Sequence, residues 1–389
     1  MRGAPFEPGV DAPQPPVYAL CVSTQRPAPP ALDLRLDVTR AAHGRVVAGP
    51  GALAHLADAW PAGAAAFVVA DARVGRLHGA AVRAALAPVA RALHVLPFRP
   101  GEASKTRRTA FRLLDRLLAL GAERSDVVVG FGGGVALDLA GVVASLALRG
   151  LPLVQVPTSL LAMIDAGIGG KAALDTPLGK NLVGAFHWPR LVAIDPGWLA
   201  TLPPAELRNG LAEAAKHAAL VGGDLLGRLE RFAGSWDGRC PPPAALVAEL
   251  AAVKVAVVQR DPFEAGERRT LNLGHTVGHA LEAAAGFALP HGEAVAVGLL
   301  VEGRVAQRLC GLPFADVARL QALLSRLGLP TAPAVPFEQA WPFLCRDKKA
   351  HGGRVRLSLL RRLGQPEPAD GSFATEVDAP TLEACWHDR

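Results

Sequence analysis

Three of the eleven histidines, His275, His279 and His291, stand close together in the sequence. His275 and His279 are four residues apart, so on a helix they share one face at about 5–6 Å. Neutral imidazoles are good ligands for zinc and similar divalent ions, and a catalytic zinc site uses about three protein ligands. Glu213, on an earlier apolar segment, could supply the third ligand. Two hydrogen-bonded histidines and a helix cap are the alternative, but the third histidine and the glutamate favour a metal site.

A run of glycines offers a second kind of chemistry. The sequence VVVGFGGGVALD predicts a buried strand, a turn over Gly133 and Gly134, and the start of a helix. Backbone amides at such a turn bind phosphate well, which suits a dinucleotide pyrophosphate. The run is not the GxGxxG fingerprint, so a tight turn with close helix–sheet packing is the alternative. Asp71, at the end of an earlier strand, could bind ribose hydroxyls or cap the helix that follows it.

Lysine is scarce, because the 41 basic residues comprise 34 arginines and seven lysines. An ammonium is a compact point charge, whereas a guanidinium is a wide fork. We therefore expect most lysines to occupy places where a fork does not fit, with compositional drift as the alternative. Donors for an anion gather near the glycine turn and the histidines: Lys171, Lys180, Asn181, Lys216, Lys254, Arg268 and Asn272. With a metal and a dinucleotide, these donors suit a small acidic, phosphorylated substrate and hydride chemistry.

Composition limits the class of protein. A chain of 389 residues with 50% hydrophobic residues has room for two or three domains with a large core. The five cysteines are scattered without a CxxC pair, which indicates a reducing, cytoplasmic compartment. The sequence contains no long uncharged apolar run of the kind that predicts a membrane span. The net charge is +6, but the arginines are dispersed, so a solvated basic surface is favoured over nucleic-acid binding.

The elements that must position these groups divide the chain in three. Residues 1–31 contain eight prolines and are expected to form a disordered extension. Residues 32–190 alternate strands with helices, which predicts an α/β domain with a parallel sheet and right-handed crossovers. Residues 191–389 are predicted to form a mostly helical domain. Its expected helices cover 204–220, 244–260, 269–288, 292–309 and 315–327, with one clear strand near residue 356.

At this point the residues resemble the 3-dehydroquinate synthase family of the shikimate pathway. The resemblance runs from about residue 35 to 362 and rests on the order and spacing of GGGVALDLAG, PTSLLAMIDAGIGGKAALDTPLGKN, LPPAELRNGLAEAAKH, RRTLNLGHTVGHALEA, HGEAVAVG and RDKK. It implies a Rossmann-like NAD-binding α/β domain, a helical metal-binding domain and an active site between them. It also implies the conversion of 3-deoxy-D-arabino-heptulosonate 7-phosphate to 3-dehydroquinate and phosphate, with NAD used and regenerated within each cycle.

The resemblance also implies roles for individual residues. The metal, Zn²⁺ or Co²⁺, would be held by Glu213, His275 and His291. The substrate phosphate would be bound by Lys171, Asn181, Asn272, His279 and Lys348, and by Arg149 from the second subunit of a homodimer. The substrate carboxylate would lie on Lys254 and Arg268, and the ring hydroxyls on Asp165 and Lys216. NAD would lie on Glu102, Lys105, Gly133, Gly134, Asp138, Thr158, Ser159, Lys171, Lys180 and Thr201, in addition to Asp71. Six of the seven lysines thus take ligand positions.

Two departures and three rival functions remain. The family usually has Lys-Thr-Gly-Val-Asn after the double glycine, whereas this chain has Lys171-Ala172-Ala173-Leu174-Asp175, which leaves the family hydroxyl at residue 172 in doubt. The NAD loop carries Thr158-Ser159 in place of two threonines. A sister sugar-phosphate cyclase is the nearest rival, and it would not need Lys254 and Arg268 together. A metal-dependent polyol dehydrogenase would release NADH, and a non-catalytic relative would have lost ligands.

Overall fold

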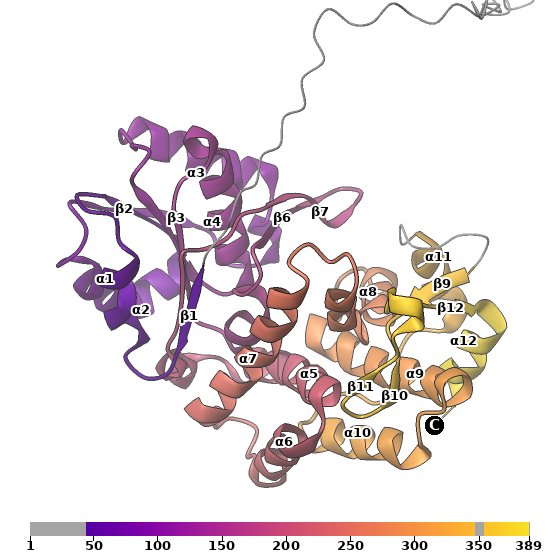
Figure 1. Cartoon of the computed structure of the whole chain (residues 1–389). Coiled ribbons are helices and arrows are strands. Elements are labelled where there is room, and N and C mark those ends of the chain that lie inside the picture. The colour runs from indigo at the N-terminus through magenta and orange to yellow at the C-terminus, as the bar shows by residue number, and fades with distance from the viewer. Residues whose placement is uncertain (1–43, 347–353, 389) are drawn as a thin grey trace, which may run out of the picture. The chain divides into compact units, whose positions relative to one another are not determined.

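A computed structural model describes residues 44–346 and 354–388, and Figure 1 shows the arrangement of its elements. Six parallel strands form one sheet in the order β1-β8-β5-β4-β2-β3. The strands are β1 (Arg45–Ala48), β2 (Ala66–Asp71), β3 (Leu93–Phe98), β4 (Val127–Gly132), β5 (Leu153–Pro157) and β8 (Leu191–Ile194). The predicted parallel sheet is confirmed. Because β8 belongs to it, the sheet extends past the domain boundary expected at residue 190.

Helices cover both faces of this sheet, which explains why its inner strands β2 and β4 are almost continuously apolar. They are α1 (Leu56–Ala59), α2 (Ala72–Leu86), α3 (Arg107–Ala119) and α4 (Gly134–Leu146). Side chains alternate along β2, so that Phe67 and Val69 pack in one core with α3 and α4. Val68 and Ala70 pack in another core with α1 and α2. The sheet is therefore the middle layer of three.

A hairpin follows β5 in the chain. Its strands are β6 (Lys171–Thr176) and β7 (Gly179–Phe186), which pair antiparallel. The chain reaches it through a single turn of π-helix, Ala162–Ala166, which carries Asp165. Such turns are rare and often occur at functional sites. The sequence analysis did not predict this hairpin, because its residues lack a clear alternation of apolar and polar side chains.

The rest of the described chain is mostly helical, as predicted. Its long helices are α5 (Pro204–Val221), α6 (Gly223–Ser235), α7 (Ala244–Arg260), α8 (His275–Ala284), α9 (His291–Cys310), α10 (Phe314–Arg326), α11 (Phe337–Arg346) and α12 (Ala379–His387). Of these, α6, α11 and α12 were not predicted. Short strands add two small sheets: β9 (Arg354–Leu357) pairs with β12 (Thr375–Asp378), and β10 (Leu360–Arg362) pairs with β11 (Gln365–Pro366).

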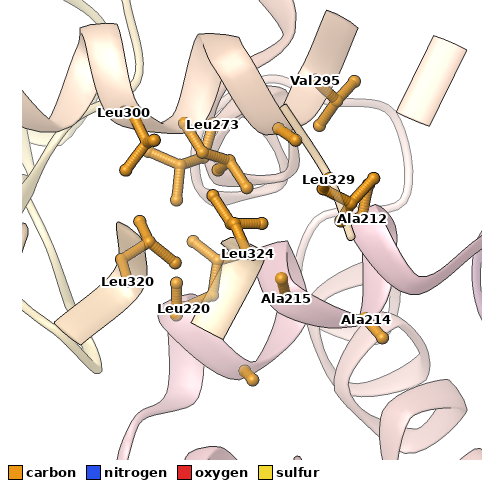
Figure 2. Close-up of a cluster of buried hydrophobic side chains, with 14 of the residues drawn as sticks. Ala212, Ala214, Ala215, Leu220, Leu273, Val295, Leu300, Leu320, Leu324 and Leu329 are labelled. Atoms are coloured by element: carbon orange, nitrogen blue, oxygen red, sulfur yellow. The ribbon is translucent and has the colours of Figure 1, made fainter. Parts of the chain in front are cut away.

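The helical core holds α5, α8 and α9 against one another. Leucines from α5, α9 and α10 meet there with Leu273 and Leu329, as Figure 2 shows. Close approach of α8 and α9 requires glycine, since a Cβ at Gly298 would overlap the carbonyl oxygen of Gly274. Gly292, at the start of α9, lies equally close to Asn209 of α5 and donates its amide to that side chain. These contacts hold the start of α8 against α9, and the start of α9 against α5.

Two predictions concern residues that are not described: the Pro-rich extension 1–31, and Lys348 of the RDKK segment. Among the described residues, no helix is both long and apolar enough to span a bilayer.

Candidate active site

The three predicted metal ligands meet where α5, α8 and α9 converge. Glu213 lies in the middle of α5, whereas His275 and His291 are the first residues of α8 and α9. Nε2 of His275 lies 3.2 Å from Oε1 of Glu213, and Nε2 of His291 lies 3.4 Å from the same oxygen. One candidate ligand atom from each residue lies within 4.8 Å of the others. A carboxylate and two imidazoles from three helices thus face one point.

The burial and the ionisation of Glu213 are consistent with a cation bound at that point. Its side chain is fully buried; Oε2 lies 2.5 Å from the ammonium of Lys216, whereas Oε1 faces the two imidazoles and has no partner with hydrogen-bond geometry among the described residues. Burial alone would raise the pKa of Glu213, but the charges of Lys216 and His275 hold it well below its usual range. A buried carboxylate that stays ionised next to two imidazoles is a suitable donor set for zinc or cobalt.

Each histidine is oriented through its other ring nitrogen. Nδ1 of His275 lies 3.1 Å from the carbonyl oxygen of Leu273, and Nδ1 of His291 lies 3.3 Å from Oε2 of Glu282. Such partners fix the ring orientation of metal-binding histidines. The sequence analysis missed Glu282, although it stands seven residues after His275 and therefore on the same face of α8. His279, one turn after His275, is exposed beside both rings at centroid distances of 5.4 and 5.9 Å.

A cluster of buried and partly buried charges adjoins the candidate metal ligands. Oδ1 of Asp165 accepts a hydrogen bond from Lys254 at 2.8 Å, and Lys216 lies 3.6 Å from the same oxygen. Lys216 also lies 2.5 Å from Glu213. Burial would raise the pKa of Asp165, but the two ammonium groups hold it well below its usual range. Burial lowers the pKa of Lys254. His217, which the sequence analysis did not select, is buried with Nε2 3.7 Å from Asp165.

Arg268 brings another cation to this cluster. Its side chain is almost fully buried, and it donates to the carbonyl oxygens of Gly169, at 2.8 Å, and Pro262. Gly169 must be a glycine here, because its φ is +107° and a Cβ would overlap the guanidinium. Burial lowers the pKa of Arg268, the direction expected for a cation with little water around it.

Two predicted phosphate ligands share a carboxylate. Lys171 forms an ion pair with Glu264, and Nδ2 of Asn272 donates to the other oxygen of Glu264 at 2.9 Å. Glu264 has a φ of +61°, an unusual value for a residue other than glycine. The sequence analysis did not select Glu264. Asn181, a third predicted phosphate ligand, accepts a hydrogen bond from Lys105 at 2.6 Å through its side-chain oxygen, and its role in phosphate binding stays a prediction.

The glycine turn lies at the carboxyl end of β4, where parallel sheets bind dinucleotides. Gly133 is the N-cap of α4, and a Cβ there would lie 3.5 Å from the hydroxyl of Ser159. Thr158 donates its amide to the carbonyl of Gly132. Asp71 caps α2, as the alternative interpretation held, by accepting from the amides of Arg73 and Val74. The turn therefore presents backbone amides next to two hydroxyl-bearing residues.

The remaining predicted cofactor residues come from several other elements. Lys105 is buried 2.6 Å from Asp138 of α4, and it follows the short 3-10 helix that begins at Glu102. The hydroxyl of Thr201 lies 2.7 Å from Nε2 of His78. Lys180, on β7, donates to Glu282 of α8 at 2.8 Å. A predicted cofactor residue is thus connected through Glu282 to the candidate metal ligand His291.

Arg149 stands apart from these groups. It ends the 3-10 helix Ala147–Arg149, is exposed, and has a φ of +70°. No contact of its side chain with the other predicted ligands is found within the described part of the chain.

Comparison with solved structures gives the class of protein. A 2-deoxy-scyllo-inosose synthase complexed with carbaglucose-6-phosphate, NAD⁺ and Co²⁺ aligns with a TM-score of 0.78 at 27% identity, covering 87% of this chain and 95% of that one. A 2-epi-5-epi-valiolone synthase from Streptomyces hygroscopicus with NAD⁺ and Zn²⁺ bound aligns with a TM-score of 0.79 at 31% identity, covering 90% and 98%. The fold is that of these cyclases.

Sequence comparison gives the particular family. The 3-dehydroquinate synthase N-terminal family matches residues 95–209, and the 3-dehydroquinate synthase C-terminal family matches residues 210–350. The 3-dehydroquinate synthase of Caulobacter vibrioides is 44% identical over 326 residues, which is 82% of this chain and 87% of that protein. This chain belongs to the 3-dehydroquinate synthase family.

Proposed function

We propose that this chain is a 3-dehydroquinate synthase, which converts 3-deoxy-D-arabino-heptulosonate 7-phosphate to 3-dehydroquinate and phosphate. The observation that carries the proposal is a pair of buried cations next to the metal ligands: Lys254 is 8% exposed and Arg268 is 2% exposed. Burying two cations costs free energy unless an anion accompanies them. A substrate carboxylate would supply that anion, in addition to Asp165. The 44% identity to a 3-dehydroquinate synthase supports the same substrate.

The residues present fit both expected cofactors. Glu213, His275 and His291 would hold Zn²⁺ or Co²⁺, because they offer a buried anionic oxygen and two imidazole nitrogens. NAD would lie over Gly133 and Gly134, whose backbone amides suit a pyrophosphate. When bound, NAD supplies reversible hydride transfer and the divalent ion supplies a Lewis acid.

The chain's own residues would bind and orient the substrate. Lys254 and Arg268 hold the carboxylate end, while Lys171, Asn272 and His279 hold the phosphate end. Oxidation of a ring hydroxyl to a ketone acidifies the neighbouring C–H, which permits loss of phosphate. The two ammonium groups beside Asp165 keep it ionised, so it can accept a hydrogen bond from a substrate hydroxyl. After phosphate has left, Lys254 and Arg268 still hold the carboxylate end, so that intramolecular aldol closure can follow once the ketone has been reduced again and the ring has opened.

A homodimer is the second part of the proposal. Strand β7 forms one edge of its hairpin, and Leu182, Val183 and Phe186 are 47, 52 and 44% exposed. Exposed apolar edge strands commonly pair with another chain. Leu146, which is 49% exposed, lies near Arg149 at the end of α4. Arg149 would reach the phosphate of the partner's active site. The four described cysteines are free, which supports a cytoplasmic location.

A sister sugar-phosphate cyclase is the second candidate, because Ala172 departs from the family pattern and two solved cyclases share the fold. A comparison of kcat/KM for the two substrates distinguishes these two functions. The proposal predicts turnover of the heptulosonate phosphate and at least about 100-fold lower kcat/KM for the seven-carbon sugar phosphate without the carboxylate. Equal or better turnover of the substrate without the carboxylate would refute the proposal.

A further inference from the structure

Glu282 is a buried carboxylate that contacts both predicted cofactor sites. It lies on α8 and is 2% exposed. One oxygen, Oε1, accepts a hydrogen bond from Lys180 at 2.8 Å, and the other, Oε2, lies 3.3 Å from Nδ1 of His291. Lys180 belongs to the β6–β7 hairpin, whereas His291 begins α9. A single side chain therefore connects the hairpin on the NAD side to a candidate metal ligand.

We infer that Glu282 is a positioning residue that couples metal binding to NAD binding; the inference rests on the function proposed above. A metal ion on Nε2 of His291 would fix the plane of that ring. The proton on Nδ1 then fixes Oε2 of Glu282, and the rigid carboxylate fixes Oε1 toward Lys180. The same chain of contacts operates in reverse when NAD orders Lys180.

A second contact keeps Lys180 on the helical side. Its ammonium lies 4.8 Å from the ring centroid of Phe287, a residue that follows α8 and has a φ of +63°. Lys180 is 30% exposed, so without these two partners its long side chain would keep most of its rotamer freedom. NAD would then have to order it on binding. Prior ordering by the metal removes part of that cost, which is the physical source of the coupling.

The coupling has a size and a symmetry that can be measured. Coupling between sites in proteins commonly amounts to about 5- to 150-fold in affinity. Because one lysine side chain carries the effect here, we expect the lower end: NAD binds about fivefold to tenfold more tightly to the zinc-loaded protein than to the metal-free protein. Linkage requires that NAD increase zinc affinity by the same factor.

The test uses the full chain without substrate. NAD is titrated by calorimetry into chelator-treated and zinc-loaded protein, and zinc affinity is measured by competition with a chelating indicator. The quantity compared is the coupling ratio, the NAD dissociation constant of metal-free protein divided by that of zinc-loaded protein. In Glu282→Gln this ratio should fall to one, and zinc affinity should fall by roughly 10- to 100-fold. In Lys180→Met, the ratio should also fall to one, while zinc affinity without NAD stays within about threefold of wild type.

Asp126→Asn is the matched control. Asp126 is a buried carboxylate that accepts from the amides of Ala65 and Glu123, and these partners belong to the sheet layer rather than to α8 or α9. This variant should keep the wild-type ratio. If Glu282→Gln fails to fold, Lys180→Met decides alone, since Lys180 is partly exposed.

Three results would overturn the inference. These are a wild-type ratio in Lys180→Met, a wild-type ratio in folded Glu282→Gln, and wild-type protein that binds zinc and NAD without coupling. Wild-type protein that turns over the substrate in any of these cases leaves the proposed function intact. Wild-type protein that binds neither zinc nor NAD would overturn the proposed function and the inference with it.

Discussion

Replacing Lys254 with methionine is the sharpest test of how the substrate is held. Lys254 is 8% exposed and its ammonium lies 2.8 Å from Asp165, so the charge acts in a site with little water. Methionine keeps most of the length and the packing of the side chain but removes the charge. A hydrogen bond to a charged group contributes about 1.5–3 kcal/mol, so kcat/KM for the heptulosonate phosphate should fall roughly 10- to 140-fold.

Steady-state phosphate release measures this loss, and an NAD titration of the same protein should give an unchanged dissociation constant. Arg260→Met is the control on the same helix, because Arg260 is exposed and pairs with Glu267. Its kcat/KM should stay within about twofold of wild type, as surface ion pairs contribute little. If Lys254→Met lost NAD affinity and substrate affinity equally, or lost neither, the assignment of Lys254 to the carboxylate would be wrong.

Three further predictions concern the candidate metal ligands, the packing of the helices that carry them, and the phosphate site. Glu213→Gln should lower zinc affinity by more than about 100-fold in chelator competition, and full metal content would remove Glu213 from the ligands. Gly298→Ala should lower the free energy of unfolding by about 1–3 kcal/mol, since its Cβ would overlap the backbone before α8. Gly227→Ala, in an uncrowded part of α6, should not destabilise, and equal urea midpoints for the two variants would contradict this packing argument. Glu264→Gln should remove the ion pair that competes with phosphate for Lys171, and so lower the dissociation constant for inorganic phosphate by about twofold to fivefold. The effect is small because the ion pair is partly exposed. Weaker phosphate binding would contradict this competition.

The sequence predicted best what depends on local spacing. The parallel strands are short apolar runs between glycine turns and helices, and a parallel sheet with helical crossovers follows from that alternation. His275 and His279 were placed on one helix face by their separation of four. The helix expected over residues 292–309 is α9, which begins at His291 after its N-cap Pro290. The convergence of His275 and His291 on Glu213 was implied by the family resemblance, not by spacing.

Contacts between segments far apart in the chain could not be predicted from the sequence. Glu264 is 93 residues from Lys171, and Glu282 is 102 residues from Lys180. Nothing in the local pattern of Glu264 marks a partner on another element. The spacing of Glu282 places it on the face of His275, but does not show that Lys180 is its partner. Asn181 has a φ of +56°, and its side-chain oxygen accepts from Lys105, 76 residues earlier in the sequence. Tertiary geometry, and not residue type, decided these three positions.

The most direct test of the proposed function is phosphate release from 3-deoxy-D-arabino-heptulosonate 7-phosphate with catalytic NAD, with NADH absorbance followed in the same cuvette before and after EDTA. The account predicts phosphate release without net NADH, lost on chelation and restored by zinc or cobalt. Steady accumulation of NADH would contradict it and indicate a dehydrogenase. Absence of turnover by protein that still binds zinc and NAD would contradict the assigned substrate.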